Sequence, residues 1–472
     1  MSVRTLAAMP EYRRLFGSRL ISNIGNGVAP IAIAFGVLAL PDGSPTGLSI
    51  VLAAQAIPVV LVLPIGGVIA DRVGRPRMIS ICDMLMAVVI GAIGLTFITG
   101  VASVPLLAVL NALAGVLVGL WYPAYPGLAA DVVPDALLQP ANAYNAVAGN
   151  GGFIVGTALG GLLVASIGSG WAILLDAVSF LIAGILVFGL RRFSRPHDSG
   201  ESPLRDLIDG WQTFIRYRWI VAVVLAFSLI VMVMRAAEEV LGPVLANEVY
   251  GGPTGWSAVL GAMAVGFLVG AVIASRIRVE RPIAFGMAVC FTLPAWLLTL
   301  ALAAPLPVVM ATAFVWGLSM EIMVVLWFTA LQRNVPPESL SRVSSYDAFG
   351  SLMFGPIGLA LAGPLLMFIP ISEAFLIAAL VAAAATAGSL LVPSVWRLRR
   401  GDGLPDIVEH GVTGYLAPEG ATAELADGLL AALADAEGIG QWAHAARQRA
   451  EAQWSTEVIV RQYLDVYEQA LA

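Results

Sequence analysis

The hydrophobic positions of this chain form twelve long apolar stretches separated by short polar segments. Most stretches contain 20 to 28 residues, the length that a helix rising about 1.5 Å per residue needs to cross roughly 30 Å of hydrocarbon. We therefore predict an all-α membrane protein with twelve transmembrane helices. The predicted helices cover residues 20–40, 47–70, 78–100, 104–130, 141–168, 171–190, 219–246, 255–275, 283–304, 307–332, 343–368 and 372–393.

The basic residues occur in every second gap, that is, in alternate polar segments between the apolar stretches. The chain has 25 arginines and no lysine. No arginine occurs in the odd-numbered gaps, which lie near Asp42, Ser103, Ser169, Gly251, Pro305 and Ile371. The N-terminal segment, the even-numbered gaps and the segment after the last stretch contain Arg4, Arg13, Arg14, Arg72, Arg75, Arg77, Arg191, Arg192, Arg195, Arg205, Arg216, Arg218, Arg276, Arg278, Arg281, Arg333, Arg342, Arg397, Arg399 and Arg400. Because positive residues accumulate in cytoplasmic loops, we predict that both termini are cytoplasmic.

The composition favours transport over nucleic-acid binding or redox chemistry. Hydrophobic residues make up 59% of the chain and charged residues 12%, about half of the roughly 25% that is usual in soluble proteins. The arginines are spread thinly over loops near the membrane, so they form no surface for nucleic acid. Cys82 and Cys290 lie inside apolar stretches and lack metal or redox spacing. We expect neither an enzyme nor a metal or cofactor site.

The chain carries signs of an internal duplication. A shift of 202 residues aligns Gly156 with Gly358 and Gly161 with Gly363. A shift of 204 residues aligns the segment 66–72 with 270–276. Chance similarity between helices rich in glycine and alanine is the alternative. Duplication predicts two pseudo-symmetric six-helix bundles, residues 1–190 and 219–395, as in many secondary transporters.

The segment 191–218, which joins the two halves, is expected to be a cytoplasmic linker. Six apolar residues recur in it at helical spacing, which predicts an amphipathic helix along the membrane surface. These residues are Leu204, Leu207, Ile208, Trp211, Phe214 and Ile215.

A motif rich in glycine and arginine follows the second stretch. Residues 67–77 read GVIADRVGRPR, which resembles the G-x-x-x-D-R-x-G-R-x-R signature of the major facilitator superfamily at the place where that family has it. The resemblance implies a cytoplasmic gate, in which Asp71 engages a helix N-terminus or an arginine of the other half. Ser275 replaces the aspartate in the second half, so an equivalent latch there should be weaker or absent. The gate residues are Gly67, Asp71, Arg72, Gly74, Arg75 and Arg77.

Two stretches contain closely spaced glycines. The stretch 141–168 is similar to the superfamily's antiporter motif G-x-x-x-G-P-x-x-G-G, with Thr157 in place of the proline, and 343–368 supplies a Gly-Pro pair. Such residues allow tight helix packing, and in a chain of this family they favour an exporter. Segments such as 176–180 also resemble the bacterial branch of siderophore exporters and macrolide-type efflux proteins. The motif residues are Gly152, Gly156, Gly160, Gly161, Gly355, Pro356 and Gly358.

Charged residues within the apolar stretches need a specific role, because each costs at least about 2.5 kcal/mol at the bilayer centre. Glu321 lies halfway along its stretch, and Arg235, Glu238 and Glu239 share one helix face. These four residues are candidates for proton coupling or substrate binding. The alternatives are a protonated structural glutamate at position 321, and a cluster in water at the outer mouth for the other three.

Further cavity candidates follow from the resemblance, since the first, fourth, seventh and tenth helices line the cavity in that family. Polar, aromatic and flexible side chains there would suit flat, apolar or cationic substrates. Several of them have a second interpretation, because arginines and aromatics near helix ends also anchor at the membrane interface. The candidates are Arg19, Asn23, Asn26, Trp121, Tyr122, Met232 and Trp316.

The segment 401–472 differs in character, because it is polar and acidic and has helical patterns at 422–435, 439–453 and 456–470. Residues 404–418 resemble the extreme C-terminus of a retaining glycosyltransferase of the GT-B type. About 70 residues cannot form the two-domain cleft of such an enzyme. We therefore expect a small, dispensable helical tail.

Taken with the resemblance, these patterns predict a monomeric secondary transporter in the bacterial plasma membrane. We expect it to export small organic molecules, such as drugs or siderophores, by proton antiport. The alternatives are import, and a membrane-anchored protein whose role depends on the glycosyltransferase-like tail. The expected partners are the substrate, protons and the lipid bilayer.

Overall fold

The computed structural model describes residues 2–190, 211–212, 214–335, 337–398, 412–415 and 422–454. Every secondary-structure element within these residues is a helix. Twelve helical segments are long and apolar enough to cross a membrane, which confirms the predicted fold class. Most of the predicted linker, including residues 204–210, lies outside the described residues.

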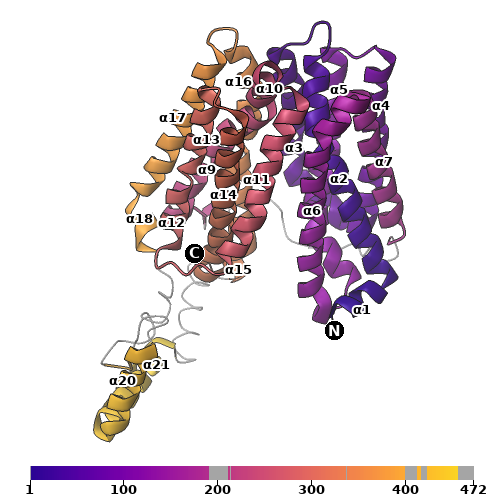
Figure 1. The fold of residues 1–472 in the computed structure, drawn as a ribbon. Helices are drawn as coiled ribbons and strands as arrows, with labels where there is room; N and C mark the ends of the chain where they lie inside the picture. The colour runs from indigo at the N-terminus through magenta and orange to yellow at the C-terminus, as the bar shows by residue number, and fades with distance from the viewer. Residues whose placement is uncertain are drawn as a thin grey trace, which may run out of the picture. The chain divides into compact units, whose positions relative to one another are not determined.

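The first half contains seven helices, of which six are candidate membrane spans (Figure 1). A short helix at the N-terminus precedes the first span. In chain order the helices are α1 (Ser2–Ala8), α2 (Pro10–Leu38), α3 (Pro45–Val73), α4 (Arg75–Thr99), α5 (Val104–Val132), α6 (Asp135–Ile167) and α7 (Ser169–Phe188).

The second half also contributes six candidate spans, but three of them are interrupted. Each interruption lies about one turn before a proline (Pro243, Pro294 or Pro356), whose missing N–H removes a hydrogen bond of the helix. In chain order the elements are α9 (Arg218–Arg235), the π-helix η2 (Ala236–Leu241), α10 (Gly242–Val249), α11 (Pro253–Ala274), α12 (Pro282–Val289), α13 (Thr292–Ala301), α14 (Leu306–Asn334), α15 (Pro337–Leu352), α16 (Gly355–Leu365), α17 (Ile371–Leu390) and α18 (Pro393–Arg397).

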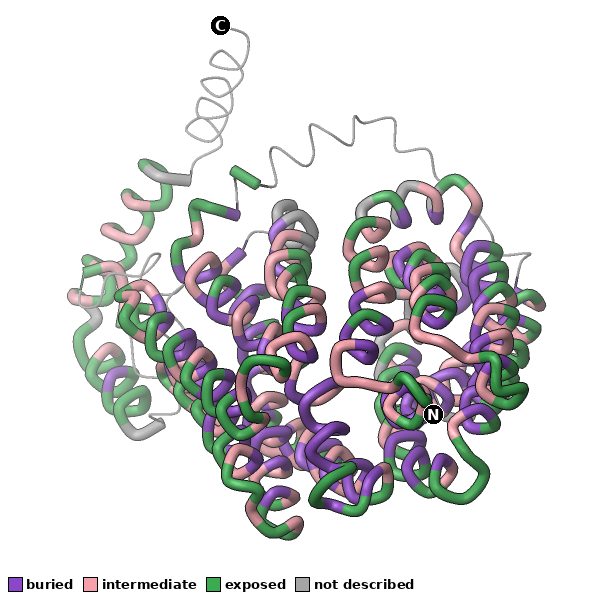
Figure 2. Tube along the Cα trace, turned by 90° about the horizontal axis from the view of Figure 1, so that it is seen from above, coloured by how far each residue is buried: buried purple, intermediate pink, exposed green. Residues whose placement is uncertain are grey.

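The same packing pairs recur in the two halves. In the first half α2 packs on α6, α3 on α5 and α4 on α7. In the second half the corresponding elements pair, with α9 and η2 on α16, α11 on α14 and α13 on α17. Figures 1 and 2 show the two resulting helix bundles side by side. This repetition is what a duplication of six spans produces.

Several helix ends extend beyond the apolar stretches. The first span begins at Pro10, about ten residues before its apolar stretch, because Glu11, Arg13 and Arg14 continue the same helix. Gly74 separates α3 from α4 with a φ of 88°. Its backbone donates to the carbonyl of Ala70 and accepts from the amide of Met78. A left-handed residue that joins two helices in this way favours glycine.

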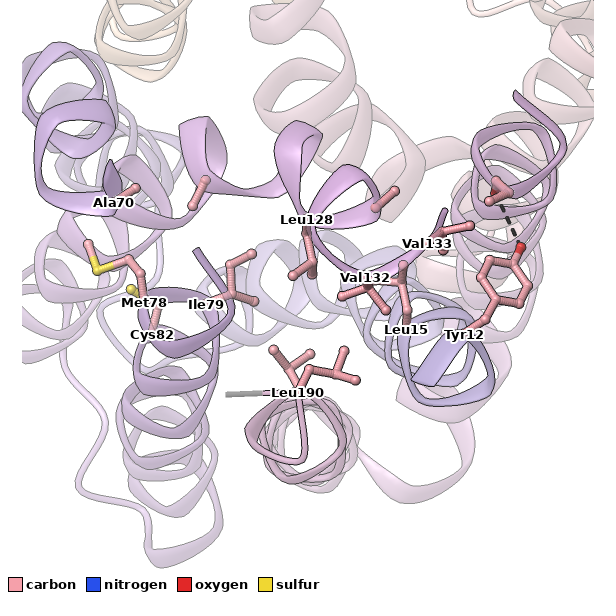
Figure 3. Close-up of a cluster of buried hydrophobic side chains, with 14 of the residues drawn as sticks. Tyr12, Leu15, Ala70, Met78, Ile79, Cys82, Leu128, Val132, Val133 and Leu190 are labelled. Atoms are coloured by element: carbon pink, nitrogen blue, oxygen red, sulfur yellow. Dashed lines mark hydrogen bonds between the residues drawn. The ribbon is translucent and has the colours of Figure 1, made fainter. Parts of the chain in front are cut away.

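A buried apolar cluster stabilises the first bundle at the end where α1 lies, which we call the amino-terminal face (Figure 3). Leu15, Ile79 and Leu128 belong to this cluster and come from α2, α4 and α5. Within the cluster, the hydroxyl of Tyr12 donates to the carbonyl of Ala141 over 3.2 Å, linking α2 to α6. The cluster therefore holds together the helix ends on either side of Gly74.

The outer surface of both bundles is apolar. Large side chains such as Leu61, Val88, Leu225, Leu361 and Leu380 are each more than half exposed, and exposed positions cover much of the outside in Figure 2. A water-soluble protein seldom exposes so much apolar surface. Lipid chains are the environment in which this surface is stable.

The chain divides into two compact units, the membrane body and a second unit that includes the tail. In the tail the structure describes residues 412–415 and the helices α20 (Thr422–Ala434) and α21 (Ala436–Trp454), which pack against each other. Leu425, Leu429 and Leu433 of α20 are exposed. The third predicted tail helix lies outside the described residues.

Candidate transport cavity

A cavity of about 570 Å³ lies between the two bundles. It is lined by α2 and α6 from the first half, and by α9, η2, α11 and α14 from the second. Its volume falls within the range of roughly 300–1,000 Å³ that is usual for small-molecule sites.

The charged residues of the lining all come from the second half. They are Arg235, Glu238, Glu239 and Glu321, the four residues predicted as coupling candidates. Arg235 forms an ion pair with Glu239. Neither Glu238 nor Glu321 forms an ion pair with any other residue that the structure describes. Three carboxyl groups and one guanidinium therefore share the cavity, which gives it an acidic character when the carboxyls are ionised.

The π-helix η2 contributes two adjacent residues, Glu238 and Glu239, to the cavity lining. Pro243 has no N–H to donate within the helix. The Trp256 indole donates to the carbonyl of Glu238 over 3.1 Å. A side chain at position 242 would overlap Trp256, so the glycine there is required. Single π-turns of this kind are frequent at functional sites.

The first half supplies a neutral wall. Its polar residues are Asn23 on α2 and Asn150 and Thr157 on α6, and Phe153 supplies apolar surface between them. The amide nitrogen of Asn23 donates to the carbonyl of Arg19 over 2.8 Å. The Oγ1 of Thr157 has no hydrogen-bond partner among the described residues, although Thr157 is only 3% exposed.

Close contact between α2 and α6 shapes this wall. Side chains at Gly27 and Gly156 would overlap the backbone of the opposite helix, and one at Gly152 would come within 2.7 Å of the Leu20 carbonyl. A side chain at Gly160 would lie 3.0 Å from Ile31 and 3.3 Å from the backbone of Val28 on α2, which is tighter than ordinary packing. Most of the glycine motif of α6 therefore lies against α2.

The last glycine of this motif faces the other bundle. A side chain at Gly161 would overlap the Pro253 carbonyl and the Ser257 hydroxyl. Gly363, its counterpart in the duplication, lies in the same way against Pro45 and Ser49, and its amide donates to the Ser49 hydroxyl over 2.7 Å. We call these two contacts the glycine seals. Both lie at the face opposite the amino-terminal face, where α3 and α11 begin.

The glycine and proline residues at the interruption between α15 and α16 lie near α9, one of the helices that line the cavity. Gly358 lies against the backbone and side chain of Met232 on α9. Gly355 faces the side chains of Arg235 and Val231 at 3.7 Å. Pro356 follows it at the start of α16.

Arg19 lies outside the cavity lining, in an aromatic cluster. Its guanidinium lies 4.4 Å from the ring centre of Tyr125 and 5.9 Å from that of Trp121. The two rings stack with their centres 4.9 Å apart. In this state Arg19 is held by the first bundle.

The remaining cavity candidates also lie outside the lining. Tyr122 is 52% exposed and Trp316 is fully buried. Asn26 is half-buried on α2, and Met232 packs against α16. The sequence could not separate aromatic residues of the cavity from those that face lipid or lie in the core, because all three kinds occur at similar places in apolar stretches.

The gate motif is described only in part. The surroundings of Gly67 and Asp71 are not among the features that the structure describes. Arg72 and Arg77 are exposed, Gly74 is buried in the turn, and Arg75 begins α4.

Sequence reasoning missed the contribution of the eighth span. Met263, Phe267 and Leu268 of α11 line the cavity, but nothing distinguishes them from other apolar residues of a membrane helix. Asn150 did offer a signal, because it is an amide inside an apolar stretch.

Several known proteins are similar to this chain. It is 29% identical over 365 residues to the multidrug efflux pump Tap of Mycolicibacterium fortuitum, covering 73% of this chain and 87% of that protein. It is 25% identical over 390 residues to the enterobactin exporter EntS of Escherichia coli O1:K1 / APEC, covering 79% of this chain and 90% of that protein.

A bacterial homologue of the iron transporter ferroportin in its inward-facing state has a similar fold. The TM-score is 0.64 at 17% identity, over 82% of this chain and 99% of that one. The family model of the Major Facilitator Superfamily matches residues 15–352. With twelve candidate membrane spans among the described residues and a cavity between its two bundles, this chain is a transporter that belongs to the Major Facilitator Superfamily.

Proposed function

We propose that this protein exports small organic molecules from the bacterial cytoplasm by alternating access, driven by protons that move inward. The observation that carries the proposal is the acidic cavity between the bundles, whose carboxyls are positioned to bind either a proton or a cationic substrate. The efflux pumps among the similar proteins support export.

We infer the direction in which the cavity opens from two features: the distribution of arginines over the loops and the position of the glycine seals. The arginine-rich loops support our proposal that the amino-terminal face is cytoplasmic. The glycine seals join the bundles at the opposite face. We therefore assign this structure to the state closed toward the outside. In the opposite state, the Asp71 loop is proposed to latch the cytoplasmic side, so Asp71→Asn should slow transport without loss of folded protein.

The proposal is tested by dye and drug efflux from cells that express the full chain. We expect a proton uncoupler to reduce energised efflux strongly, because it removes the proton gradient. Glu321→Gln and Glu238→Gln should each have the same effect, because each removes a carboxyl that could carry the proton. Glu373→Gln is the matched control, since Glu373 is exposed at the start of α17 and does not line the cavity. Full efflux in both cavity variants, or efflux unaffected by the uncoupler, would contradict proton coupling through this site.

A further inference from the structure

We propose that Tyr125 and Asn145 form a hydrogen bond in the opposite transport state, and that Arg19 keeps them unbonded in the state described here. This inference rests on the proposed function, in that the protein is taken to alternate between two states. It adds a conformational switch inside the first bundle, since neither Tyr125 nor Asn145 lines the cavity. The equivalent pair of the second bundle, Trp327 and Asp347, is bonded.

The two pairs occupy equivalent positions, each around a corner between consecutive helices. The residues of each pair lie eight positions before and twelve positions after a valine that ends a helix, Val133 in the first half and Val335 in the second. The two valines have nearly the same backbone, with φ −111° and ψ 137° for Val133 and φ −113° and ψ 128° for Val335. The two corners therefore place the paired residues alike.

In the second bundle the bond across this corner is made. The indole nitrogen of Trp327 on α14 donates to Oδ2 of Asp347 on α15 over 2.9 Å. Trp219 of α9 covers the Trp327 ring, with the ring centres 5.4 Å apart. Asp347 is only 8% exposed, so the bond satisfies a buried polar group. A corner of this shape thus permits a hydrogen bond between the two helices that it joins.

In the first bundle the corresponding groups have no partner. The hydroxyl oxygen of Tyr125 and the amide oxygen of Asn145 are buried, and neither forms a hydrogen bond with any described residue. The hydroxyl can donate and the amide oxygen can accept, so the two groups are complementary. Because unpaired buried polar groups are costly, this state is penalised relative to one in which the two groups bond.

Arg19 of α2 is the difference between the two bundles. Its guanidinium lies 4.4 Å from the ring centre of Tyr125, whereas the ring of Trp327 is covered by a neutral indole. Arg19 also lies against α6, because a side chain at Gly149 would come within 2.8 Å of its Nε. Gly149 is one helical turn beyond Asn145. Arg19 therefore contacts both helices of the pair, and its departure from the aromatic cluster would free Tyr125 to bond with Asn145.

The inference is tested on the purified full-length protein with two measurements. Spin labels at the exposed positions Asp42 and Thr254 report the ratio of open to closed molecules at the face of the glycine seals, and thermal unfolding reports stability. Tyr125→Phe removes only the hydroxyl. We expect the open-to-closed ratio to fall about 5-fold, the effect of one neutral hydrogen bond. The melting temperature should not fall, because the hydroxyl has no partner among the described residues in the closed state.

Three further variants complete the design. Trp327→Phe removes a bond that is made in this state, so it should lower the melting temperature. Tyr122→Phe is the matched control and should change neither measurement, because Tyr122 lies on the same helix as Tyr125 and is 52% exposed. Arg19→Met keeps a long apolar side chain and removes the guanidinium. It should raise the open-to-closed ratio, and adding Tyr125→Phe should cancel that increase.

Three results would overturn the inference: a melting temperature that Tyr125→Phe lowers as much as Trp327→Phe does, an open-to-closed ratio that Tyr125→Phe leaves unchanged, and an effect of Arg19→Met that persists without the Tyr125 hydroxyl. Because efflux is measured separately, the two proposals fail separately. A shifted ratio in a protein without efflux would refute export and leave the switch intact, whereas efflux with an unshifted ratio would do the reverse.

Discussion

At the scale of single residues, the two adjacent glutamates of η2 have different partners. Glu239 is paired with Arg235, whereas Glu238 has no ionic partner among the described residues. Neutralising one carboxyl should therefore have a different effect from neutralising the other. The pair stabilises the local fold, and the unpaired carboxyl is available to a proton or a ligand.

Glu239→Gln should lower the stability of the purified protein more than Glu238→Gln. Breaking the ion pair should cost about 1 kcal/mol rather than the larger value of a fully buried pair, because the Arg235 side chain is 46% exposed. Glu238→Gln removes no partner and should leave stability nearly unchanged while reducing transport. Thermal unfolding in detergent measures both variants. Equal melting temperatures would show that the ion pair contributes nothing.

The site residues that the sequence revealed were those whose presence in a membrane helix is costly. Glu321, Arg235 and Asn23 could be identified because charges and amides are rare in apolar stretches. Trp316 could not be placed, because an indole is equally compatible with core and cavity. Thr157 was visible as a departure from a motif, but its unpartnered hydroxyl depends on how α6 lies against α2, which the sequence does not specify.

At the scale of elements, one side chain of a neighbouring helix forms a hydrogen bond to the backbone of η2. The Trp256 indole donates to the Glu238 carbonyl. Trp256→Phe keeps most of the ring and removes the donor, so the turn should lose its preferred geometry. We expect a several-fold loss of transport with a stability loss of about 1 kcal/mol.

Trp296→Phe is the control for this experiment. Trp296 is also fully buried and stacks on Trp256, but its indole nitrogen has no partner among the described residues. It should transport like the wild type. If the two variants behave alike, the hydrogen bond to Glu238 has no specific role.

The glycine seals also belong to this scale. Gly161→Val and Gly363→Val should each force the bundles apart at the face opposite the amino-terminal face, because no side chain fits against Pro253 or Pro45. The population should therefore shift toward the other transport state.

Spin labels at the exposed positions Asp42 and Thr254 would measure this shift, one on each bundle near that face. The label distance should increase in the Gly161 and Gly363 variants. It should stay constant in Gly388→Val, the matched control, because nothing lies within 4 Å of a side chain added at Gly388. An unchanged distance in the seal variants would show that the contacts do not hold that face closed.

The twelve spans could be predicted because each one must satisfy a length and hydropathy requirement by itself. The interruptions of the second half could not be located to the residue, although Pro243, Pro294 and Pro356 lie beside them. Prolines also occur inside the continuous helices α2 and α6. Whether a proline breaks a helix depends on the neighbouring helices that can satisfy the freed carbonyl.

At the scale of the whole molecule, the tail belongs to a different compact unit from the membrane body. Its polar and acidic sequence also differs from the apolar sequence of that body. Deleting all residues after Arg400 should leave membrane insertion and efflux intact, because the cavity and both glycine seals lie before that point. Efflux by the truncated chain measures this directly. Loss of efflux, or a sugar-transfer activity that disappears with the deletion, would show that the tail has a function of its own.

The central claim is that the carboxyls of the cavity couple proton movement to export. The most direct measurement is transport in proteoliposomes that contain the purified protein, comparing accumulation driven by an imposed pH gradient with exchange at equal pH. We predict that Glu321→Gln loses pH-driven accumulation and keeps exchange, because it retains size and hydrogen bonding but cannot release a proton. If Glu321→Gln and Glu238→Gln both accumulate substrate against its gradient as fast as the wild type, the account is contradicted.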